Sequence, residues 1–304
     1  MVEARSSSSN GVGPKPSWES SSGLTVSVVI PAYNEAKNIG WVLRRIPAGV
    51  DEVLVVDRCS PDDTAAVAAA LYPGVRVIDE PRKGKGLALR TGFEAASCDV
   101  VVMIDADGSM DPAEIGLYVD AIGRGHDFVK GSRFMVGGSS DDITAVRAWG
   151  NRALMAAANL LYMSRFTDLC YGYMAFRRDV LGELALTGTG FEIETEIVVN
   201  AVKANLRICE VPTHELERRS GGSNLHAVRD GRRVLATMLR ARFRTWRDGE
   251  LTLVKSPPRT EPVVLEPVVF EPVVDLTEGG LHLIRPTDQT ELLAGPIDRT
   301  SAST

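Results

Sequence analysis

The stretch VVMIDADGSMDP, residues 101–112, runs from an apolar segment directly into two aspartates. The apolar residues from Val100 to Ile104 are mostly β-branched and continuous, which is typical of a strand buried on both faces of a parallel sheet. Asp105 and Asp107 would then lie at the carboxyl end of that strand, where open α/β sheets bind their ligands. The stretch therefore predicts an α/β fold with a ligand site at one edge of its sheet.

The two aspartates have the chemistry of a metal site. Asp111, followed by Pro112, already supplies a helix start, which leaves Asp105 and Asp107 without a capping role. Gly108 permits the turn that both carboxylates need in order to reach one ligand. Two hard oxygen ligands with no His or Cys nearby suit Mg²⁺ or Mn²⁺ held jointly with substrate phosphates. We therefore predict a metal site at Asp105 and Asp107.

On both sides of this strand, short apolar runs alternate with segments that carry apolar residues at spacings of three and four. This alternation predicts crossover connections and a doubly wound, mostly parallel sheet sandwiched by helices. The predicted strands cover residues 26–30, 52–57, 75–79, 100–104 and 127–131, and the predicted helices include residues 36–46, 64–71 and 86–96.

Composition divides the chain into three parts. With 304 residues and 44% hydrophobic content, the chain can bury the core of one large α/β domain, which we place at residues 24–250. Residues 1–23 are rich in Ser, Gly and Pro and predict a disordered leader. Residues 251–304 contain Glu-Pro-Val-Val three times, and proline is too frequent there for a helix or a central strand. They predict a largely disordered tail whose role is left open.

Charge and hydropathy exclude other classes of protein. The formal net charge is −6 and the acidic excess lies mostly in the tail, which argues against generic nucleic-acid binding. No apolar run approaches the ~18 residues of a membrane-spanning helix, and the start of the chain has no signal-peptide pattern. The four cysteines lie far apart, which is typical of reduced thiols. The sequence therefore predicts a cytoplasmic protein.

Polar side chains also follow the other predicted strands. PAYNE (31–35) follows the first strand, Asp57 ends the second, and the loop EPRKGKG (80–86) places Lys85 among glycines after the third. Each of these alone is typical of a helix cap or a solvated turn. Because the carboxyl ends of parallel strands share one edge of a sheet, together they predict a site in which a nucleotide could lie.

The order and spacing of several segments resemble those of a known family. SVVIPAYNEAKNI (27–39), GKGLALRTGF (84–93), MIDADGSMDPAEI (103–115) and KGSRF (130–134) are similar to motifs of family 2 glycosyltransferases with the GT-A fold. The dolichyl-phosphate mannosyltransferase-like branch is the most similar, and the resemblance spans residues 25–247.

This resemblance implies a site for a nucleoside-diphosphate sugar, GDP- or UDP-linked, with Mg²⁺ or Mn²⁺. Arginine suits phosphate oxygens because its planar fork donates two parallel hydrogen bonds. The donor-binding residues that the family implies are Pro31, Ala32, Tyr33, Glu35, Asp57, Lys85, Asp105, Ala106, Asp107, Arg133 and Arg219.

The second half of the chain resembles the acceptor side of the same branch, in DLCYGYMAFRRDVL (168–181) and GFEIETE (190–196). The branch implies inversion at the anomeric carbon by a single displacement. A polyprenyl phosphate acceptor is already anionic and needs no base, whereas the hydroxyl of a glycan needs a carboxylate to take its proton. Asp168, Glu192 and Glu194 are then the candidate bases, one at most, although each could instead cap a turn or a helix start.

Two local differences from the family pattern bear on the donor. The usual D-D-G-S turn is Asp57-Arg58-Cys59-Ser60 here, and the lysine of the S-K-L segment is Asn224. The first changes the contacts to the base or ribose, and the second removes a cation from the phosphate side. The sequence therefore leaves the sugar, the nucleoside and the acceptor open.

Two other functions remain as alternatives at this stage. A sugar-phosphate nucleotidyltransferase would share the fold class and the metal carboxylates, but it favours a glycine-rich, basic loop after the first strand, where PAYNEAKN stands here. A degenerate, non-catalytic protein that binds nucleotide sugars or acts as a scaffold is suggested by Arg58 and Cys59 and by the repeat tail.

Two predicted helices complete the domain. Residues 226–247 combine an apolar stripe with seven arginines. Either the stripe packs on the α/β core, or the helix is a peripheral anchor whose arginines meet the anionic inner face of a membrane. Residues 147–162 form a second apolar helical stretch, in which Trp149 and Tyr162 are predicted to lie in the core.

Overall fold

The computed structural model describes residues 23–221, 227–247, 271–274 and 281–284. The chain divides into two units, residues 1–259 and residues 260–304. In the second unit, strand β10 (Glu271–Val274) pairs antiparallel with β11 (Leu281–Ile284). The third Glu-Pro-Val-Val repeat thus forms a strand where the sequence predicts a largely disordered tail. The predicted leader and the rest of the tail lie outside the described residues, apart from Gly23.

The first unit is built on a seven-stranded sheet in the order β3-β2-β1-β4-β7-β5-β8. Six strands are parallel, and β7 runs antiparallel between β4 and β5. The predicted mostly parallel sheet is therefore confirmed, with strands at β1 (Val26–Ala32), β2 (Glu52–Asp57), β3 (Arg76–Asp79), β4 (Val100–Met103), β5 (Phe128–Ser132), β7 (Met174–Arg177) and β8 (Ile208–Pro212).

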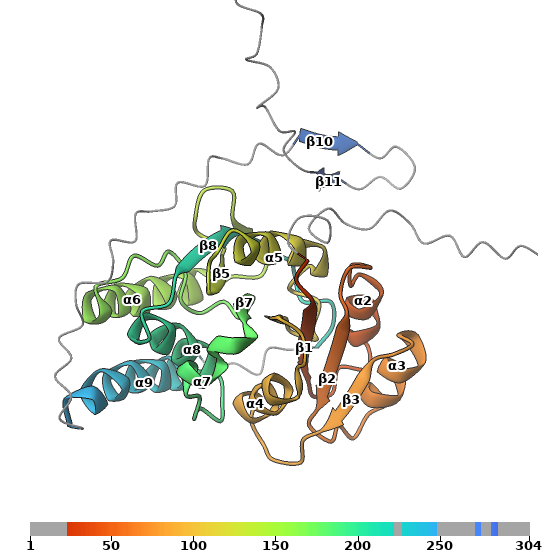
Figure 1. Ribbon diagram of the computed structural model, residues 1–304, viewed down its shortest axis with the longest axis horizontal. Coiled ribbons are helices and arrows are strands. Elements are labelled where there is room, and N and C mark those ends of the chain that lie inside the picture. Colours follow the sequence, from red (N-terminus) through yellow and green to blue (C-terminus); the bar gives the residue numbers. More distant parts are fainter. Residues whose placement is uncertain (1–22, 222–226, 248–270, 275–280, 285–304) are drawn as a thin grey trace, which may run out of the picture. The chain divides into compact units, whose positions relative to one another are not determined.

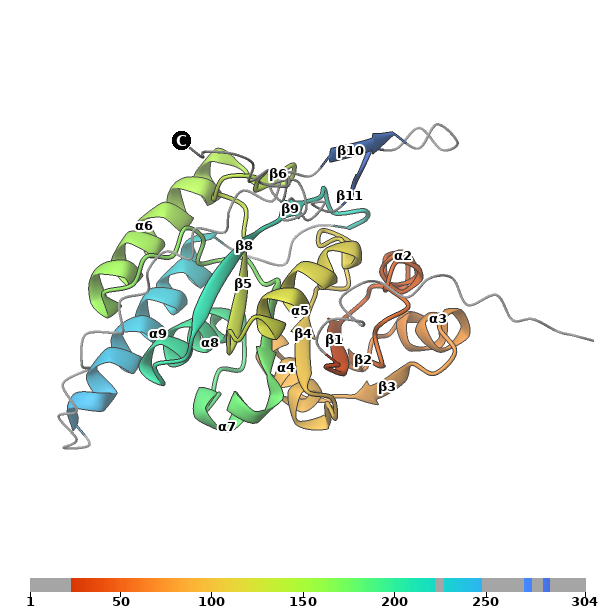
Figure 2. The same ribbon diagram turned by 45° about the horizontal axis from the view of Figure 1, so that its top comes forward.

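Helices cover both faces of this sheet. Figures 1 and 2 show α2 and α3 on the opposite side of β1 and β2 from α4. Helix α5 packs on β4, β7 and β5, whereas α6, α8 and α9 cluster together and share one buried core with α4. The helices are α2 (Ile39–Arg44), α3 (Thr64–Leu71), α4 (Lys85–Ala95), α5 (Ile115–Gly123), α6 (Ala145–Tyr162), α7 (Leu181–Leu184), α8 (Glu192–Lys203) and α9 (Ala227–Arg247). Strands β6 (Ser139–Ser140) and β9 (His214–Glu215) form a separate, short parallel pair. Turns of 3-10 helix precede α5 at Pro112–Glu114 and α7 at Arg178–Val180.

The apolar runs form strands because helices bury their side chains on both faces of the sheet. Every residue of β4 is fully buried, as are Val28, Val29 and Ile30 of β1. Such continuous β-branched runs suit a sheet with helices on each side. Because β1, β2 and β4 are parallel neighbours, their carboxyl ends and the polar residues that follow them meet at one edge of the sheet.

The two helices predicted last behave differently from each other. In α9, Val234 and Met238 are buried against the shared core, which agrees with the packing interpretation of its stripe. In α6, Tyr162 is buried and donates a hydrogen bond to the carbonyl of Met238 at 2.5 Å, as a core position should. Trp149 is 71% exposed, so its predicted place in the core is wrong. Helix α6 has apolar residues on two faces, and periodicity alone cannot tell which face is buried.

Glu114, at the end of the turn before α5, is a partly buried carboxylate whose titration is expected to affect stability. Its oxygens accept hydrogen bonds from the hydroxyl of Thr213 and from the backbone N–H of His214. Burial raises the pKa of Glu114 to about 7, helped by the charge of Asp111 and opposed by these hydrogen bonds. An acid whose pKa is raised on folding makes the folded state lose stability as pH rises from the unfolded pKa to the folded one.

We therefore expect Glu114→Gln to stabilise the protein in a pH-dependent way. Near pH 5 the wild-type carboxyl is already neutral, so the two proteins should have similar free energies of unfolding. Near pH 8 the variant should be more stable by about 1–3 kcal/mol, because it avoids a buried charge. Urea unfolding at several pH values measures this difference. An equal difference at all pH values would mean that Glu114 does not titrate in this range.

Candidate functional site

A cleft of about 410 Å³ lies at the carboxyl ends of β1 and β4. It gathers carboxylates and arginines from segments that are far apart in the sequence. Its lining includes Pro31, Ala32, Tyr33, Glu35, Arg58, Lys85, Asp105, Ala106, Asp107, Asp142, Arg147, Glu194, Glu215, Arg218, Arg229 and Arg233.

The segment after β1 forms one wall of the cleft, as the sequence predicts for Pro31, Ala32, Tyr33 and Glu35. The guanidinium of Arg58 lies 3.5 Å from the centre of the Tyr33 ring, so the residue that departs from the family pattern adds a cation to this wall. Such a stacked pair presents a flat surface of the kind on which a nucleobase can lie.

Asp57 holds the turn after β2. Its carboxylate accepts hydrogen bonds from the backbone N–H and the hydroxyl of Ser60, at 3.0 and 2.5 Å, and its side chain is buried. Cys59, in the same turn, has a φ of 49°, a conformation that favours glycine. The position where the family pattern has glycine thus keeps a left-handed backbone although the side chain has changed.

Asp105 meets Lys85 and Glu194 in the centre of the cleft. The Lys85 ammonium lies 2.6 Å from a carboxylate oxygen of each. Burial, opposed by the charge of Lys85 and aided by those of Asp107 and Glu194, raises the pKa of Asp105 to about 6. Burial also lowers the pKa of Lys85, but the two carboxylates outweigh burial and raise it overall.

The glycines around Lys85 make this arrangement feasible. At Gly86, an added Cβ would lie 2.5 Å from the backbone carbonyl oxygen of Gly188. The loop before α8 therefore approaches the first turn of α4 backbone to backbone, with a hydrogen bond from the Gly86 N–H to the Thr189 carbonyl at 3.1 Å. This close approach brings Glu194 to Lys85.

Asp107 lies beside Asp105, on the turn that Gly108 makes with a φ of 80°. One oxygen of Asp107 accepts hydrogen bonds from the backbone N–H and hydroxyl of Ser109, at 2.9 and 2.7 Å. The other lies 2.5 Å from the guanidinium of Arg218, which also lies 3.6 Å from Glu35. The Asp107 carboxylate is thus fixed in position by its own turn and by one arginine.

The donor set suits a hard divalent cation completed by a ligand. Within the described ranges, no three His, Cys, Asp or Glu side chains form a metal-binding group on their own. Asp105 and Asp107 supply two carboxylates, and Glu194 adds a third negative charge beside them. Burial, and after it the charges of Asp107 and Glu194, raise the pKa of Asp105. Mg²⁺ is commonly held by one or two carboxylates plus substrate phosphates, so these residues fit such an ion.

Arg218 and Arg219 are neighbours in the chain, and the cleft is lined by Arg218 instead of the predicted Arg219. Arg219, predicted to bind the donor, packs its stem against Gly108 and holds its guanidinium 4.9 Å from the centre of the Trp41 ring. Arg218 lines the cleft instead. Successive residues of an extended segment point to opposite sides, so a motif match cannot decide between neighbours.

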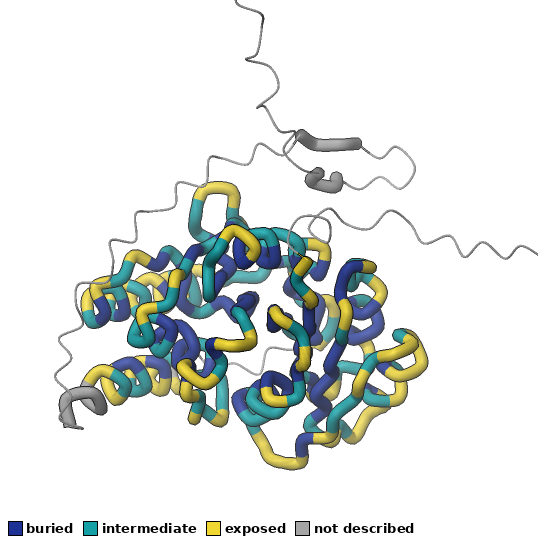
Figure 3. The backbone as a smooth tube through the Cα atoms, in the orientation of Figure 1, coloured by how far each residue is buried: buried dark blue, intermediate teal, exposed yellow. Residues whose placement is uncertain are grey.

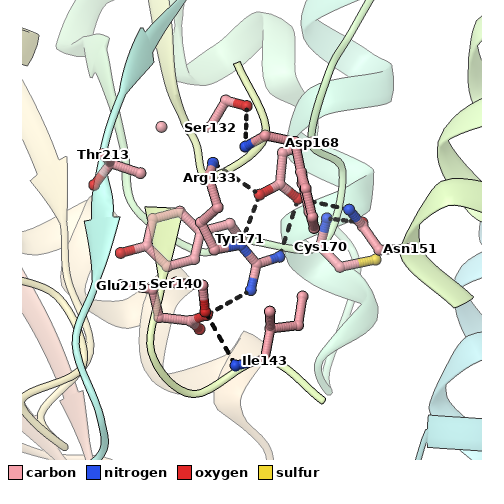
Figure 4. A network of polar contacts seen from close by, with 12 residues as sticks. Ser132, Arg133, Ser140, Ile143, Asn151, Asp168, Cys170, Tyr171, Thr213 and Glu215 are labelled. Atoms are coloured by element: carbon pink, nitrogen blue, oxygen red, sulfur yellow. Dashed lines mark hydrogen bonds and ion pairs between the residues drawn. The ribbon is translucent and has the colours of Figure 1, made fainter. Parts of the chain in front are cut away.

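Arg133, predicted to face a phosphate, is buried in a network of ion pairs (Figure 4). It donates to both oxygens of Asp168, at 2.7 and 3.1 Å, and to Glu215 at 3.0 Å. Asn151 also donates to Asp168, at 3.0 Å. These bonds occupy the guanidinium and keep the pKa of Asp168 low despite the burial that would raise it. Asp168 thus acts as an anchor in this structure, an arrangement that does not suit a base.

The other two candidate bases also differ from each other. Glu192 accepts hydrogen bonds from the backbone N–H groups of Thr189 and Gly190, at 3.1 and 2.9 Å, and so stabilises the loop before α8. Glu194 lines the cleft and binds Lys85. Of the three carboxylates, Glu194 is the one that the structure brings to Asp105 and Asp107.

Three arginines that the sequence analysis did not assign to the site line the cleft from α6 and α9. Arg147, from α6, forms an ion pair with Asp142 at 3.0 Å. Arg229 and Arg233, from α9, lie 3.6 and 3.8 Å from Asp230. Their spacing of four places both α9 residues on one face of the helix, which the sequence does show. Only the packing of α9 beside α6 reveals that this face meets the cleft.

Comparisons with known proteins agree with this geometry. The sequence model of the family described as Glycosyl transferase family 2 matches residues 27–185. Glycosyltransferase AglJ of Haloferax volcanii is 34% identical over 211 residues, which cover 68% of each chain. Polyprenol monophosphomannose synthase of Mycolicibacterium smegmatis is 33% identical over 217 residues, which cover 65% of this chain and 80% of that relative.

A solved structure shares the fold. Glucosyl-3-phosphoglycerate synthase of Mycobacterium tuberculosis, in complex with Mn²⁺, UDP and glucosyl-3-phosphoglycerate, superposes with a TM-score of 0.59 at 27% identity, and the match covers 74% of this chain and 81% of that one. The fold and family that the sequence motifs imply are therefore confirmed. The chain belongs to glycosyltransferase family 2, and it is a glycosyltransferase with the GT-A fold.

Proposed function

We propose that this glycosyltransferase moves a sugar from a GDP- or UDP-linked donor to a polyprenyl phosphate, with inversion at the anomeric carbon. The observation that carries the proposal is a group of three arginines, Arg147, Arg229 and Arg233, which line the cleft from α6 and α9, and we call this part of the cleft the acceptor wall. Asp105 and Asp107 line the cleft from the segment after β4, which we call the donor wall. An anionic acceptor is favoured beside three arginines. The named activity of the mycobacterial relative, a polyprenol monophosphomannose synthase, supports the same acceptor class.

On the donor wall, we assign the nucleoside to the segment from Pro31 to Glu35 and to the Arg58–Tyr33 stack. Asp105 and Asp107 would hold Mg²⁺ or Mn²⁺, and such an ion neutralises the charge that develops on a diphosphate leaving group. Lys85 and Arg218, which pair with these carboxylates in the structure, are placed to add positive charge for the phosphates. Mn²⁺ and UDP in the similar solved structure support this assignment.

On the acceptor wall, the phosphate oxygen of a polyprenyl phosphate is itself the nucleophile. It is already anionic, so the reaction needs no base. Arg147, Arg229 and Arg233 would orient that oxygen toward the anomeric carbon. The product would be a sugar phosphodiester, and the nucleoside diphosphate would leave from the side of Asp105 and Asp107. Polysaccharide or glycolipid biosynthesis uses products of this kind.

A second candidate is transfer to a hydroxyl of a glycan or small phosphorylated acceptor. The position of Glu194 in the cleft favours it, because this carboxylate could accept the proton of a hydroxyl. Two further candidates, a sugar-phosphate nucleotidyltransferase and a non-catalytic nucleotide-sugar-binding scaffold, have no observation in the cleft that favours them.

The Glu194→Gln variant separates the two acceptor classes. With a polyprenyl phosphate acceptor, we expect turnover to fall by less than about tenfold and its pH profile to keep the same shape, because no base is lost. Glu192→Gln is the matched control, since it makes the same change outside the cleft. Turnover should be measured with both acceptor classes and with GDP- and UDP-sugars in the presence of Mn²⁺.

A loss on the order of 10³-fold in Glu194→Gln, without a change in donor affinity, would reverse the conclusion. It would mean that Glu194 is a base and that the acceptor is a hydroxyl. The proton-accepting role should then also appear as a lost acid limb in the pH profile of the variant.

We also propose that the protein is cytoplasmic and contacts the anionic inner face of a membrane through residues 226–247. Within the described residues, every helix is too short or too polar to cross a lipid bilayer. The substrate class supports a peripheral contact, because polyprenyl chains reside in membranes. The exposed arginines of α9 supply charge for anionic headgroups.

A further inference from the structure

The outer face of α6 carries an exposed row of apolar side chains. The large ones are strongly exposed: Val146 by 73%, Trp149 by 71%, Leu160 by 82% and Met163 by 73%. Ala153 and Ala156 lie between them, so the row repeats at alternating spacings of three and four along the whole helix. We call these six residues the α6 outer row. Soluble proteins rarely expose a contiguous apolar row of this length unless it binds something.

The buried face of α6 is on the opposite side, so the outer row is not a misplaced part of the core. Ala158 and Tyr162 are buried there in the core that α8 and α9 share, and Asn151 is buried there beside Asp168. Figure 3 shows exposed positions recurring along both α6 and α9. The row is therefore extra apolar surface that the fold of the domain does not need.

The charged side chains that α6 itself carries are all positive. Helix α6 contains no Asp or Glu, and Arg152 lies on its exposed side with its guanidinium 6.0 Å from the Trp149 ring. Next to it, α9 exposes Leu235 and Leu239. The single acidic residue of α9, Asp230, is buried, whereas Arg232, Arg240 and Arg242 are exposed. Apolar rows bordered by arginines, with a tryptophan among them, are typical of helices that lie at a lipid interface.

The row also begins where the site opens. A second, smaller cavity of about 90 Å³ lies between α6 and α9 and is lined by Val146, Gly150 and Leu154 from α6. Arg147 and Glu194 line both this cavity and the main cleft. Val146 is therefore both the first member of the outer row and part of the wall that leads to the acceptor side. An acceptor with an apolar tail could leave the cleft along this path without crossing water.

We propose that the α6 outer row, with the exposed leucines and arginines of α9, is a docking surface for an anionic lipid membrane. The inference rests on the proposed polyprenyl phosphate acceptor for its biological reason, but the surface itself is an observation independent of catalysis. The apolar side chains enter the interface, and the arginines meet anionic headgroups. Docking in this way turns the end of the cleft that carries Arg147 toward the lipid.

Charge argues against a second copy of this chain as the occupant. Two α6 helices packed through their outer rows would bring the arginines of both copies together, and α6 offers no acidic residue to pair them. Helix pairs that associate through rows with this spacing usually carry opposite charges beside the row. An anionic surface suits the arginines that α6 and α9 carry beside the α6 outer row.

The surface is tested with purified full-length protein and vesicles at low ionic strength. We expect it to co-sediment with vesicles that contain phosphatidylglycerol, to bind phosphatidylcholine vesicles weakly, and to be released by high salt. Leu160→Gln should lower the partition into anionic vesicles by about tenfold, because it removes one inserted apolar side chain. Leu71→Gln is the matched control, since Leu71 is an exposed leucine on α3, and it should bind as wild type does.

A second measurement places the contact on α6 itself. Vesicles with brominated acyl chains quench tryptophan at the interface, and we expect wild type to be quenched more than Trp149→Phe. Equal quenching in the two proteins, or equal partition of Leu160→Gln and Leu71→Gln, would overturn the proposal. A dimer in sedimentation velocity that Leu160→Gln dissociates would assign the row to a second copy instead.

Failure of this surface and failure of the proposed function can be told apart. With a short, water-soluble isoprenyl phosphate, Leu160→Gln should turn over like wild type, and with a long polyprenyl phosphate in vesicles it should be slower. Transfer to the short acceptor with vesicle binding that ignores Leu160 would refute the surface alone. Vesicle binding that depends on Leu160, with no transfer to any polyprenyl phosphate, would refute the function alone.

Discussion

Asp107→Asn is expected to lower the rate of sugar transfer by a factor on the order of 10² to 10³. The amide is almost the same size as the carboxylate, so the turn at Gly108 and the hydrogen bonds from Ser109 can be retained. What is lost is the negative charge that would share a divalent cation with Asp105. The amide also leaves Arg218 without its nearest anion in the cleft. Transfer should be assayed across a range of Mn²⁺ concentrations, since a weakened metal site shows a raised Mn²⁺ requirement.

Asp111→Asn is the matched control for this experiment. Asp111 stands four residues further on, pairs with Arg45 at 2.8 Å and accepts from the N–H of Ala113, and it does not line the cleft. Its amide variant should transfer sugar at the wild-type rate. Wild-type turnover in Asp107→Asn, at low as well as saturating Mn²⁺, would remove Asp107 from the metal site. A lower melting temperature in Asp107→Asn would show that its loss of activity comes partly from unfolding.

The fold could be predicted because its cause is local in the sequence. In a continuous β-branched run such as Val100 to Met103, side chains on both faces of the strand must be buried. Two layers of helices provide this burial, so the run indicates a parallel sheet. Polar residues directly after such runs must then meet at one edge, and Asp105 and Tyr33 do line a common cleft. The antiparallel direction of β7 could not be predicted in this way, because the sequence of a short strand such as Met174–Arg177 does not show which way it runs in the sheet.

The rest of the site depends on contacts that the sequence does not contain. Arg218 and Arg219 are neighbours of the same type, and only the course of the backbone decides which one enters the cleft. Arg233 reaches the site because α9 packs beside α6, a tertiary contact between helices that lie about eighty residues apart in the chain. Trp149 shows the same limit, because α6 carries apolar residues on two faces and its sequence does not show which face is buried. Periodicity finds a helix but not its partner.

Replacing Arg133 has the largest expected effect on stability, because its guanidinium holds a buried network of ion pairs together. Arg133 is buried and bonded to Asp168 and Glu215. Arg133→Met keeps the length of the stem and leaves both carboxylates buried without their cation. Breaking a buried ion pair from one side costs about 3–5 kcal/mol, since the remaining charge cannot be solvated. The midpoint of urea unfolding should therefore fall markedly.

Two further variants show whether burial is the cause of this loss. Arg207 forms the same bidentate pair with Asp127, at 3.0 and 2.7 Å, but its side chain is exposed. Water and salt screen such a pair, so Arg207→Met should unfold close to the wild-type midpoint. The double variant Arg133→Met with Asp168→Asn removes one uncompensated charge together with its partner, and it should be more stable than Arg133→Met alone. Stability that returns when a second group is removed is the mark of a buried unpaired charge. If Arg133→Met instead unfolds like wild type but loses its thermal stabilisation by GDP or UDP, Arg133 is a phosphate ligand, and the network around Asp168 must open when the donor binds.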